Sequence, residues 1–398
     1  MPRFPWFPPM KLAFSTGRPA HVVLPANLLA KRNVDVTIYT AAYRRRFRQL
    51  APAVHLHWVP QLVPTLHFLT GVQLPRPLQR ADTAIYDHLV ALRMGNFDIF
   101  WGWASGSLAA GRAARRRGAC FVLDRACPHV DAQQALVRTE CERLGVPYHA
   151  EPDWFRARQL AEYEEADVIL VPSAYSRRSF PAALQNKVMI APLFGRVPAA
   201  QSFVSTDRAA RDTNAEAHPF TFGTVGGQPL RKGFLYLLQA WKRLQLSNAR
   251  LLLRTDAPLH RFPALRDLLR QLPNVEIVDY CANMGDFYRR CDAFVLPTID
   301  DGFGMVLLEA MAHGLPAIAT NHCGSAELFA AGRDLLIVQA QDVDALSAAM
   351  QQLYTSAELQ EKLRSNAQLT LQRIEGDGSY ELYSGALDRI LSRVKVTR

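Results

Sequence analysis

Two acids and a Gly-Phe-Gly turn stand close together in the stretch DDGFGMVLLEAMAHGLPAIAT, residues 300–320. The residues around Glu309 are almost all apolar, too continuously for a surface helix with one apolar stripe, so we expect a largely buried helix whose carboxylate needs a partner. If the residues from Asp301 to Glu309 were all helical, the two would lie about 12 Å apart along the axis. Glycosidase carboxylates work at about 5 to 9.5 Å, so this pair is a poor candidate for hydrolysis. Asp301 and Glu309 could instead hold two ends of one extended ligand. Alternatively, Glu309 and His313, which are four residues apart, could form one polar stripe on the helix.

A lysine beside a predicted helix start is the second candidate, in the stretch GGQPLRKGF. Gly226 and Gly227 permit close backbone approach, and Lys232 comes just before a helix expected to begin near Gly233. A lysine next to exposed helix N–H groups is typical of a phosphate site. Neither the Walker spacing nor the Gly-x-Gly-x-x-Gly fingerprint is present. The alternative is an ordinary lysine at the start of a helix.

The elements that must position these residues alternate between apolar strands and helical patterns. Strands that are apolar throughout and separated by helices predict an α/β protein with parallel sheets covered on both faces. Ligands in such sheets bind beyond the carboxyl ends of the strands, and both candidate stretches follow predicted strands. The predicted strands are KLAFST, VDVTIYTA, FDIFWGW, ACFVLDRA and ADVILVPS in the first half, and FTFGTVG, ARLLLRT, NVEIVDY and DAFVLPT in the second.

The chain of 398 residues is too long for one ordinary core and suits two domains that enclose a cleft. We predict a first domain over 1–195 and, because strand and helix patterning is lost there, a linker over 196–217. A second domain is expected over 218–372. A last helix within 373–398 would close the second domain and cross back to the first.

Arginine supplies most of the net charge of +10 and gathers at 44–48 and 112–117. Such runs attract phosphate or anionic surfaces. For 112–117 we favour the basic end of a helix. For 44–48, which contains Phe47, a contact with an anionic membrane or acceptor is as well supported as a solvated loop. No nucleic-acid partner is expected, because no recognition motif accompanies the charge.

Six cysteines occur without any Cys-x-x-Cys pair, so neither a zinc site nor a disulfide framework is indicated. Free thiols favour a cytoplasmic protein, with association at the inner face of a membrane as an option. The first residues lack an apolar segment long enough for a secretion signal, and either Met1 or Met10 could be the start.

The second half, from FGTVGGQPLRKGFLYLLQAW through FVLPTIDDGFGMVLLEAMAHGLPAIATNHCGSAEL, resembles the family-4 glycosyltransferases (glycosyl transferases group 1). LDRACPHV and EYEEADVILVPSAYSRRSF in the first half are also similar. The resemblance implies the GT-B fold, two Rossmann-like doubly wound parallel-sheet domains facing a cleft. It further implies a retaining transferase that moves a sugar, expected to be a hexose, from a nucleotide-diphosphate donor to a carbohydrate or lipid-linked acceptor. No metal or other cofactor is expected.

The resemblance also implies roles for the residues of the opening stretch. Glu309 would bind the ribose hydroxyls of the nucleotide sugar. Asp301, with the Gly302 turn and the amides of Phe303 and Gly304, would face the donor sugar. The family has Glu where this chain has Asp301, one methylene shorter.

The implied diphosphate clamp and active-site histidine complete the candidate set. Lys232 matches the clamp lysine, but Gly227 stands where the family usually has an Arg, and Arg231 is the candidate replacement. His129 matches the histidine that contacts the donor hexose, although it could equally begin a helix or pack in a core. His129 and Lys232 are the predicted catalytic residues.

Two weaker matches and two other classes of function stay open. Gly17 aligns with the family's glycine turn near the donor phosphate, and Glu327 with a recurring acid, which a helix cap would explain as well. Gly227 and Asp301 motivate a non-catalytic sugar-nucleotide-binding protein. The arginine runs motivate a basic adaptor for membranes or nucleic acid.

Overall fold

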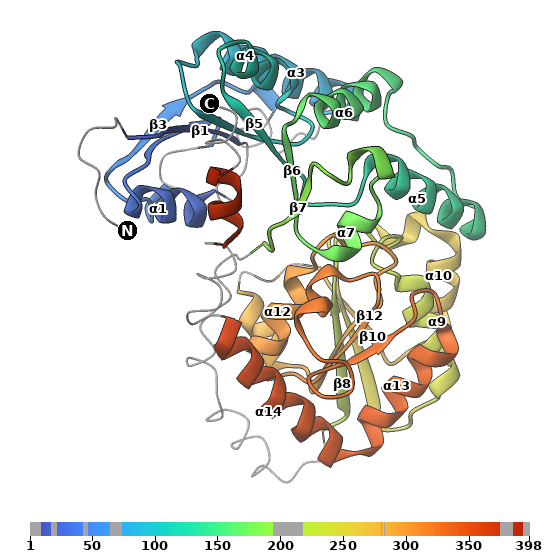
Figure 1. The fold of residues 1–398 in the computed structure, drawn as a ribbon. Helices are drawn as coiled ribbons and strands as arrows, with labels where there is room; N and C mark the ends of the chain where they lie inside the picture. The colour runs from blue at the N-terminus through green and yellow to red at the C-terminus, as the bar shows by residue number, and fades with distance from the viewer. Residues whose placement is uncertain are drawn as a thin grey trace.

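The computed structural model describes residues 9–16, 22–42, 47–63, 74–193, 218–279, 281, 283–374 and 385–392. Gly17 and the predicted linker 196–217 lie outside the described residues. Figure 1 shows two α/β domains, each built on its own sheet.

The N-terminal domain contains a seven-stranded parallel sheet in the order β3-β2-β1-β4-β5-β6-β7. Its strands are β1 Lys11–Thr16, β2 Asp35–Thr40, β3 Val54–Trp58, β4 Ile99–Trp103, β5 Cys120–Asp124, β6 Val168–Val171 and β7 Val188–Ile190. Its helices are α1 Val23–Lys31, α3 Arg76–Arg93, α4 Leu108–Arg116, α5 Val130–Leu144, α6 Asp153–Glu165, α7 Ala174–Arg178 and the 3₁₀ turn η3 Ala182–Leu184.

The C-terminal domain contains a six-stranded parallel sheet in the order β10-β9-β8-β11-β12-β13. Its strands are β8 Phe220–Val225, β9 Ala249–Arg254, β10 Val275–Val278, β11 Ala293–Leu296, β12 Ala317–Thr320 and β13 Leu336–Val338. Its helices are α9 Phe234–Leu244, α10 Pro263–Arg270, α11 Met284–Arg289, α12 Met305–Ala312, α13 Val343–Thr355, α14 Ala357–Arg373 and the 3₁₀ turns η5 Leu259–Arg261 and η6 Gly324–Leu328.

Both faces of each sheet are buried, which explains why the central strands read as continuous apolar runs. In β1, Leu12 and Phe14 pack into one core while Ala13 between them packs into another, on the side of α3 and α4. In β9, Leu252 faces one core and its neighbours Leu251 and Leu253 face a second. The fold predicted from the sequence, two doubly wound parallel-sheet domains, is confirmed.

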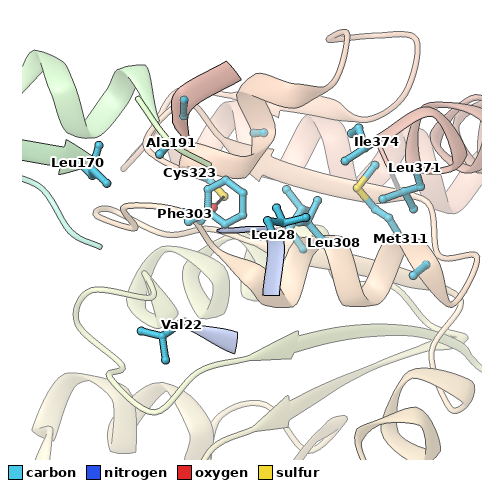
Figure 2. Close-up of a cluster of buried hydrophobic side chains, with 14 of the residues drawn as sticks. Val22, Leu28, Leu170, Ala191, Phe303, Leu308, Met311, Cys323, Leu371 and Ile374 are labelled. Atoms are coloured by element: carbon cyan, nitrogen blue, oxygen red, sulfur yellow. Dashed lines mark hydrogen bonds between the residues drawn. The ribbon is translucent and has the colours of Figure 1, made fainter. Parts of the chain in front are cut away.

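Apolar side chains connect the two domains in one cluster, part of which Figure 2 shows. Val22 and Leu170 of the N-terminal domain belong to it, as do Phe303 and Met311 of the C-terminal domain. Because the domains share a buried apolar cluster, the interface between them includes apolar packing as well as polar contacts.

A last helical segment, residues 385–392, lies at the dark red end of the chain in Figure 1, beside α1. Asp388 in this segment pairs with Arg32, just after α1, at 3.0 Å between Oδ1 and an Arg32 terminal nitrogen. Ala386, Leu387 and Ile390 are buried. The described end of the chain therefore contacts the N-terminal domain. None of the helices described is both long and apolar enough to cross a membrane.

Candidate functional site

Two loops meet at the carboxyl edge of the C-terminal sheet, one following β8 and the other following β11. The amide of Ile299 in the second loop donates to the carbonyl of Arg231 in the first at 2.9 Å. Gly233 permits this approach, because a Cβ at that position would lie 1.9 Å from the carbonyl oxygen of Pro297. Its φ of +67° also favours glycine. The two stretches singled out in the sequence thus form one site.

Lys232 and Asp301 form an ion pair, with Nζ and Oδ2 2.5 Å apart. The stem of Lys232 crosses Gly226, where an added Cβ would lie 2.5 Å from the lysine Cγ. Burial raises the pKa of the Asp301 carboxyl, but the positive charges of Lys232 and Arg231 outweigh burial and hold that pKa below its ordinary value. Asp301 is therefore ionised at neutral pH, and the pair places an ammonium group at the sheet edge.

Asp300, rather than Asp301, is the acid of this loop that joins the two domains. Its side chain is only 2% exposed and accepts from Arg231 Nε of its own domain at 3.0 Å. From the N-terminal domain, Gln133 Nε2 donates at 2.7 Å and the Tyr175 hydroxyl at 2.9 Å. Burial and then the Asp300 charge raise the pKa of Tyr175, so this phenol stays protonated and can donate. Three donors satisfy a carboxylate that burial would otherwise penalise.

Arg231, the candidate replacement for the missing clamp arginine, lies next to the Lys232 pair in the chain. Its Nε and one terminal nitrogen bind the carboxylate and carbonyl of Asp300, and the other terminal nitrogen donates to Gln228 Oε1 at 2.8 Å. The protein itself therefore holds the guanidinium in place. Contact of Arg231 with a phosphate stays a prediction.

Glu309 lies in the second turn of the largely buried helix α12, as predicted, and has a partner in the protein. The Tyr288 hydroxyl on α11 donates to Glu309 Oε2 at 3.0 Å. Burial and then the Glu309 charge raise the pKa of Tyr288, which keeps the phenol protonated. His313 Nδ1 lies 2.7 Å from the Glu309 carbonyl oxygen, and its ring lies 4.8 Å from the Tyr288 ring. The predicted stripe of Glu309 and His313 is thus completed by a tyrosine.

His129 is the N-cap of α5 and is 5% exposed. Its Nδ1 accepts from the Asp131 amide at 3.2 Å, and its ring packs against Tyr163 and Phe180 at 5.0 and 5.1 Å between centroids. Burial, followed by nearby arginines, lowers the pKa of His129 although Asp131 opposes this, so the ring is neutral at pH 7. With Nδ1 accepting, the proton of the neutral ring lies on Nε2. Both alternatives to catalysis, beginning a helix and packing, describe what His129 does in this structure.

The Gly302 turn contacts the N-terminal domain directly. The Gly302 carbonyl accepts from the hydroxyls of Ser173 at 2.8 Å and Ser176 at 3.3 Å. An added Cβ at Gly302 would lie 2.4 Å from the carbonyl oxygen of Ala126. The turn that the resemblance assigns to the donor sugar is therefore also a contact between domains.

The next two residues of the turn, Phe303 and Gly304, lead into α12. The Phe303 amide donates to Asp301 Oδ1 at 3.4 Å, and its ring is buried. Gly304 begins α12 with a φ of +82°. That these two amides face a donor sugar stays a prediction.

Glu327, on η6, accepts from the amides of Ala174 and Tyr175, both at 2.7 Å. It also pairs with Arg178 at 3.2 Å. The helix-cap interpretation is thus correct, with the unforeseen detail that the helix, α7, belongs to the other domain.

The arginine runs have different surroundings. In 112–117, Arg112 and Arg115 pair with Glu165 at 2.9 and 3.0 Å near the end of α4, as expected for a basic helix end. In 44–48, residues 44–46 lie outside the described residues, and the Phe47 side chain is buried at 4% exposure. Phe47 is therefore not an exposed aromatic that could enter a membrane.

In the part of the chain that the structure describes, no cluster of three or more His, Cys, Asp or Glu side chains could hold a metal ion. The charged groups of the site are paired with one another, Lys232 with Asp301 and Arg231 with Asp300.

The sequence of the C-terminal domain matches a known family of enzymes. Residues 219–356 match the model of the glycosyl transferases group 1 family, and this match runs from β8 to the end of α13 and includes both loops of the site. The C-terminal domain is a group 1 glycosyltransferase domain. The predicted resemblance to the glycosyl transferases group 1 is thereby confirmed for this domain, and so is the predicted enzyme class, glycosyltransferase, whereas membership of family 4 stays a prediction.

Relatives of this glycosyltransferase extend the similarity beyond the C-terminal domain. The D-inositol 3-phosphate glycosyltransferase of Stackebrandtia nassauensis is 25% identical over 88% of the chain and 82% of that protein. The capsular polysaccharide biosynthesis glycosyltransferase CapM of Staphylococcus aureus is 30% identical over 41% of the chain, but the match spans only 43% of that protein. HepE of Anabaena, solved with UDP and glucose, superposes with a TM-score of 0.64 over 96% of this chain and all of HepE at 15% identity. At that identity the likeness establishes the GT-B fold alone.

Proposed function

We propose that this glycosyltransferase moves a sugar from a nucleotide-diphosphate donor to a carbohydrate or lipid-linked acceptor, with retention at the anomeric carbon. The observation that carries the proposal is the Lys232–Asp301 pair, which puts a cation at the carboxyl edge of the C-terminal sheet, beside the contact with the other domain. Switch-point edges of this kind bind nucleotides in open α/β sheets. A UDP-sugar is the first donor to test, since HepE was solved with UDP and glucose.

Lys232 would act on the leaving group. The bond between the anomeric carbon and the diphosphate oxygen breaks, the electron pair leaves with the diphosphate, and the ammonium stabilises the growing charge. Asp301 holds Lys232 in position before the donor binds. Because the turn after Asp301 contacts the N-terminal domain, the reacting carbon would lie where water is excluded.

The acceptor hydroxyl would attack from the face that the diphosphate leaves and pass its proton to the leaving phosphate oxygen. No protein nucleophile is then required. His129 would serve by donating from Nε2 to a donor hydroxyl, since its Nδ1 already accepts from the backbone. In the proposed complex, Glu309 binds the ribose hydroxyls while Tyr288 orients the carboxylate.

Replacing Glu309 by Gln is expected to weaken nucleotide binding by about 1.5–3 kcal/mol, the worth of a charge-assisted hydrogen bond. Tyr288→Phe, which removes only the orienting donor, should have a smaller effect in the same direction. Isothermal titration with UDP, GDP and ADP measures both. Unchanged affinity in a folded Glu309→Gln protein would rule out Glu309 as the ribose ligand.

Activity is expected to survive chelation of divalent metals, because the charge of the leaving diphosphate is met by Lys232 and by backbone N–H groups. Transfer assays with excess EDTA should give the same rate as assays with added Mg²⁺ or Mn²⁺, within about twofold. Loss of turnover on chelation, restored by one of these ions, would contradict this mechanism.

A thermal-shift screen of nucleotide sugars, followed by turnover assays, tests the proposed function as a whole. A donor that binds only the folded state raises the unfolding temperature. Transfer or donor hydrolysis by the purified chain would support the enzyme; binding without turnover over a broad acceptor panel would favour a sugar-nucleotide-binding protein instead.

We propose a cytoplasmic location, at the inner face of a membrane. All six cysteines are free thiols, which suits a reducing compartment. Fractionation of cells that express the chain tests the location.

A further inference from the structure

Three exposed aliphatic side chains line one side of α3 in the N-terminal domain. Leu78, Ile85 and Leu92 are 54%, 54% and 80% exposed. They are spaced by seven residues, and side chains seven residues apart on an α-helix point within about 20° of the same direction. At 1.5 Å per residue they form a stripe about 21 Å long.

A fourth exposed aliphatic side chain lies beside this stripe. Leu62 is 72% exposed, and its amide donates to Asp82 of α3 at 2.9 Å. The Val63 amide donates to the other oxygen of the same carboxylate at 3.1 Å. The short segment before α3 is thereby held against the helix with its leucine outward.

Both acidic residues of α3 are turned inward. Asp82 is occupied by the two amides just named. Asp87 is fully buried, pairs with Arg158, and accepts from the amides of Ala109 and Ala110 at the start of α4. The exposed side of α3 consequently carries no carboxylate.

Three exposed arginines lie near the ends of the stripe, and a fourth arginine, Arg80 of α3, is paired with Glu151 at 2.5 Å. Arg76 and Arg93 stand at the two ends of α3. Arg117, exposed at the end of α4, donates to the carbonyl of Met94 at 3.0 Å, which places a third cation at the C-terminal end of α3. In Figure 1, α3 and α4 lie on the side of the N-terminal sheet that faces away from the C-terminal domain.

We propose that this α3 face (Leu62, Leu78, Ile85 and Leu92 with Arg76, Arg93 and Arg117) lies on the surface of an anionic lipid bilayer. Separate aliphatic side chains ringed by cations are typical of a helix lying in a membrane interface. A protein partner is less well matched, because stable interfaces bury about 800 Å² per partner around a contiguous apolar centre. The proposal concerns a surface remote from the sugar-transfer site and does not depend on that activity.

Vesicle flotation with the purified full-length chain, without any nucleotide or sugar, tests the proposal. The chain should float with vesicles of phosphatidylglycerol mixed with phosphatidylcholine, less with pure phosphatidylcholine, and less at high salt. The triple variant Leu78→Gln, Ile85→Gln, Leu92→Gln should bind at least about tenfold more weakly. Gln keeps helix propensity, so the unfolding temperature should stay near that of the wild type.

Two controls separate the α3 face from general charge and hydrophobicity. Leu369→Gln on α14, at 56% exposure, should leave vesicle binding unchanged. Arg76→Glu with Arg93→Glu should abolish binding, whereas the equal charge change Arg266→Glu with Arg270→Glu on α10 should preserve most of it.

Three results would overturn the proposal. They are a wild-type chain that does not float with anionic vesicles, a triple variant that floats equally well, and a solution dimer that the triple variant dissociates while vesicle binding persists. The last would assign the α3 face to a second copy of this chain.

Discussion

Replacing Lys232 by Ala is expected to lower the turnover of sugar transfer by about 10²- to 10³-fold, the cost of removing one preorganised group that stabilises transition-state charge. The physical reason lies in the geometry at the sheet edge. Lys232 is fixed by Asp301 at 2.5 Å and by its passage over Gly226, so it need not be reorganised when charge develops on the leaving diphosphate. The rate is measured with saturating donor, because binding of the ground state should change less than turnover.

Stability must be separated from catalysis in this experiment. Removing the lysine leaves a mostly buried, ionised Asp301 without its partner, which costs about 3–5 kcal/mol of folding free energy for a buried pair. The double variant Lys232→Ala with Asp301→Asn removes both charges and should recover most of that stability without recovering turnover. Lys242→Ala on α9, whose ammonium binds only Gln271 among the contacts described, is the matched control. Near wild-type turnover in the folded double variant would exclude Lys232 from catalysis.

Asp300→Ala should have the second large effect, a loss of about 3–5 kcal/mol in the free energy of unfolding. The change leaves the Arg231 guanidinium without its carboxylate and removes the acceptor of Gln133 and Tyr175. Urea denaturation followed by tryptophan fluorescence measures the loss. Because the acceptor lies between domains, the transition should also become less cooperative.

Two further variants provide reference values for the loss of unfolding free energy in Asp300→Ala. Tyr175→Phe deletes one of the three donors and should cost only about 1 kcal/mol. Asp286→Ala removes an acid of the same type from an exposed pair on α11 and should change stability little. If Asp300→Ala were no more destabilising than Asp286→Ala, Asp300 would not be the acid that joins the domains.

The strands that carry the site could be predicted because each is buried on both faces. FTFGTV and AFVL are apolar runs for this reason, and they form β8 and β11 as expected. β3 was missed because its sequence VHLHW alternates polar and apolar residues, and the strand lies at the sheet edge with most of its side chains partly or fully exposed. α3 was missed because it exposes leucine and isoleucine while it buries Asp82 and Asp87, so its apolar and polar positions do not follow the pattern of a surface helix.

The residues of the candidate site could be predicted only where the interacting residues are close in sequence or where the family pattern names them. Lys232 and Asp301 were both singled out, but their pairing depends on two loops that meet only after the sheet has formed. Asp300 draws its partners from 125 and 167 residues away, across two domains, and no local pattern encodes such contacts. The tyrosine that binds Glu309 is likewise 21 residues distant on another helix.

At Gly302 the backbones of the two domains are in direct contact, with no side chain between them. The backbone of Ala126 occupies the volume that any side chain at this position would need, and the methyl group of alanine alone would meet a carbonyl oxygen at 2.4 Å. Backbone cannot yield as a flexible side chain can, so even alanine at position 302 would wedge the halves apart. The close approach of the two domains thus restricts position 302 to glycine, whichever sugar the enzyme transfers.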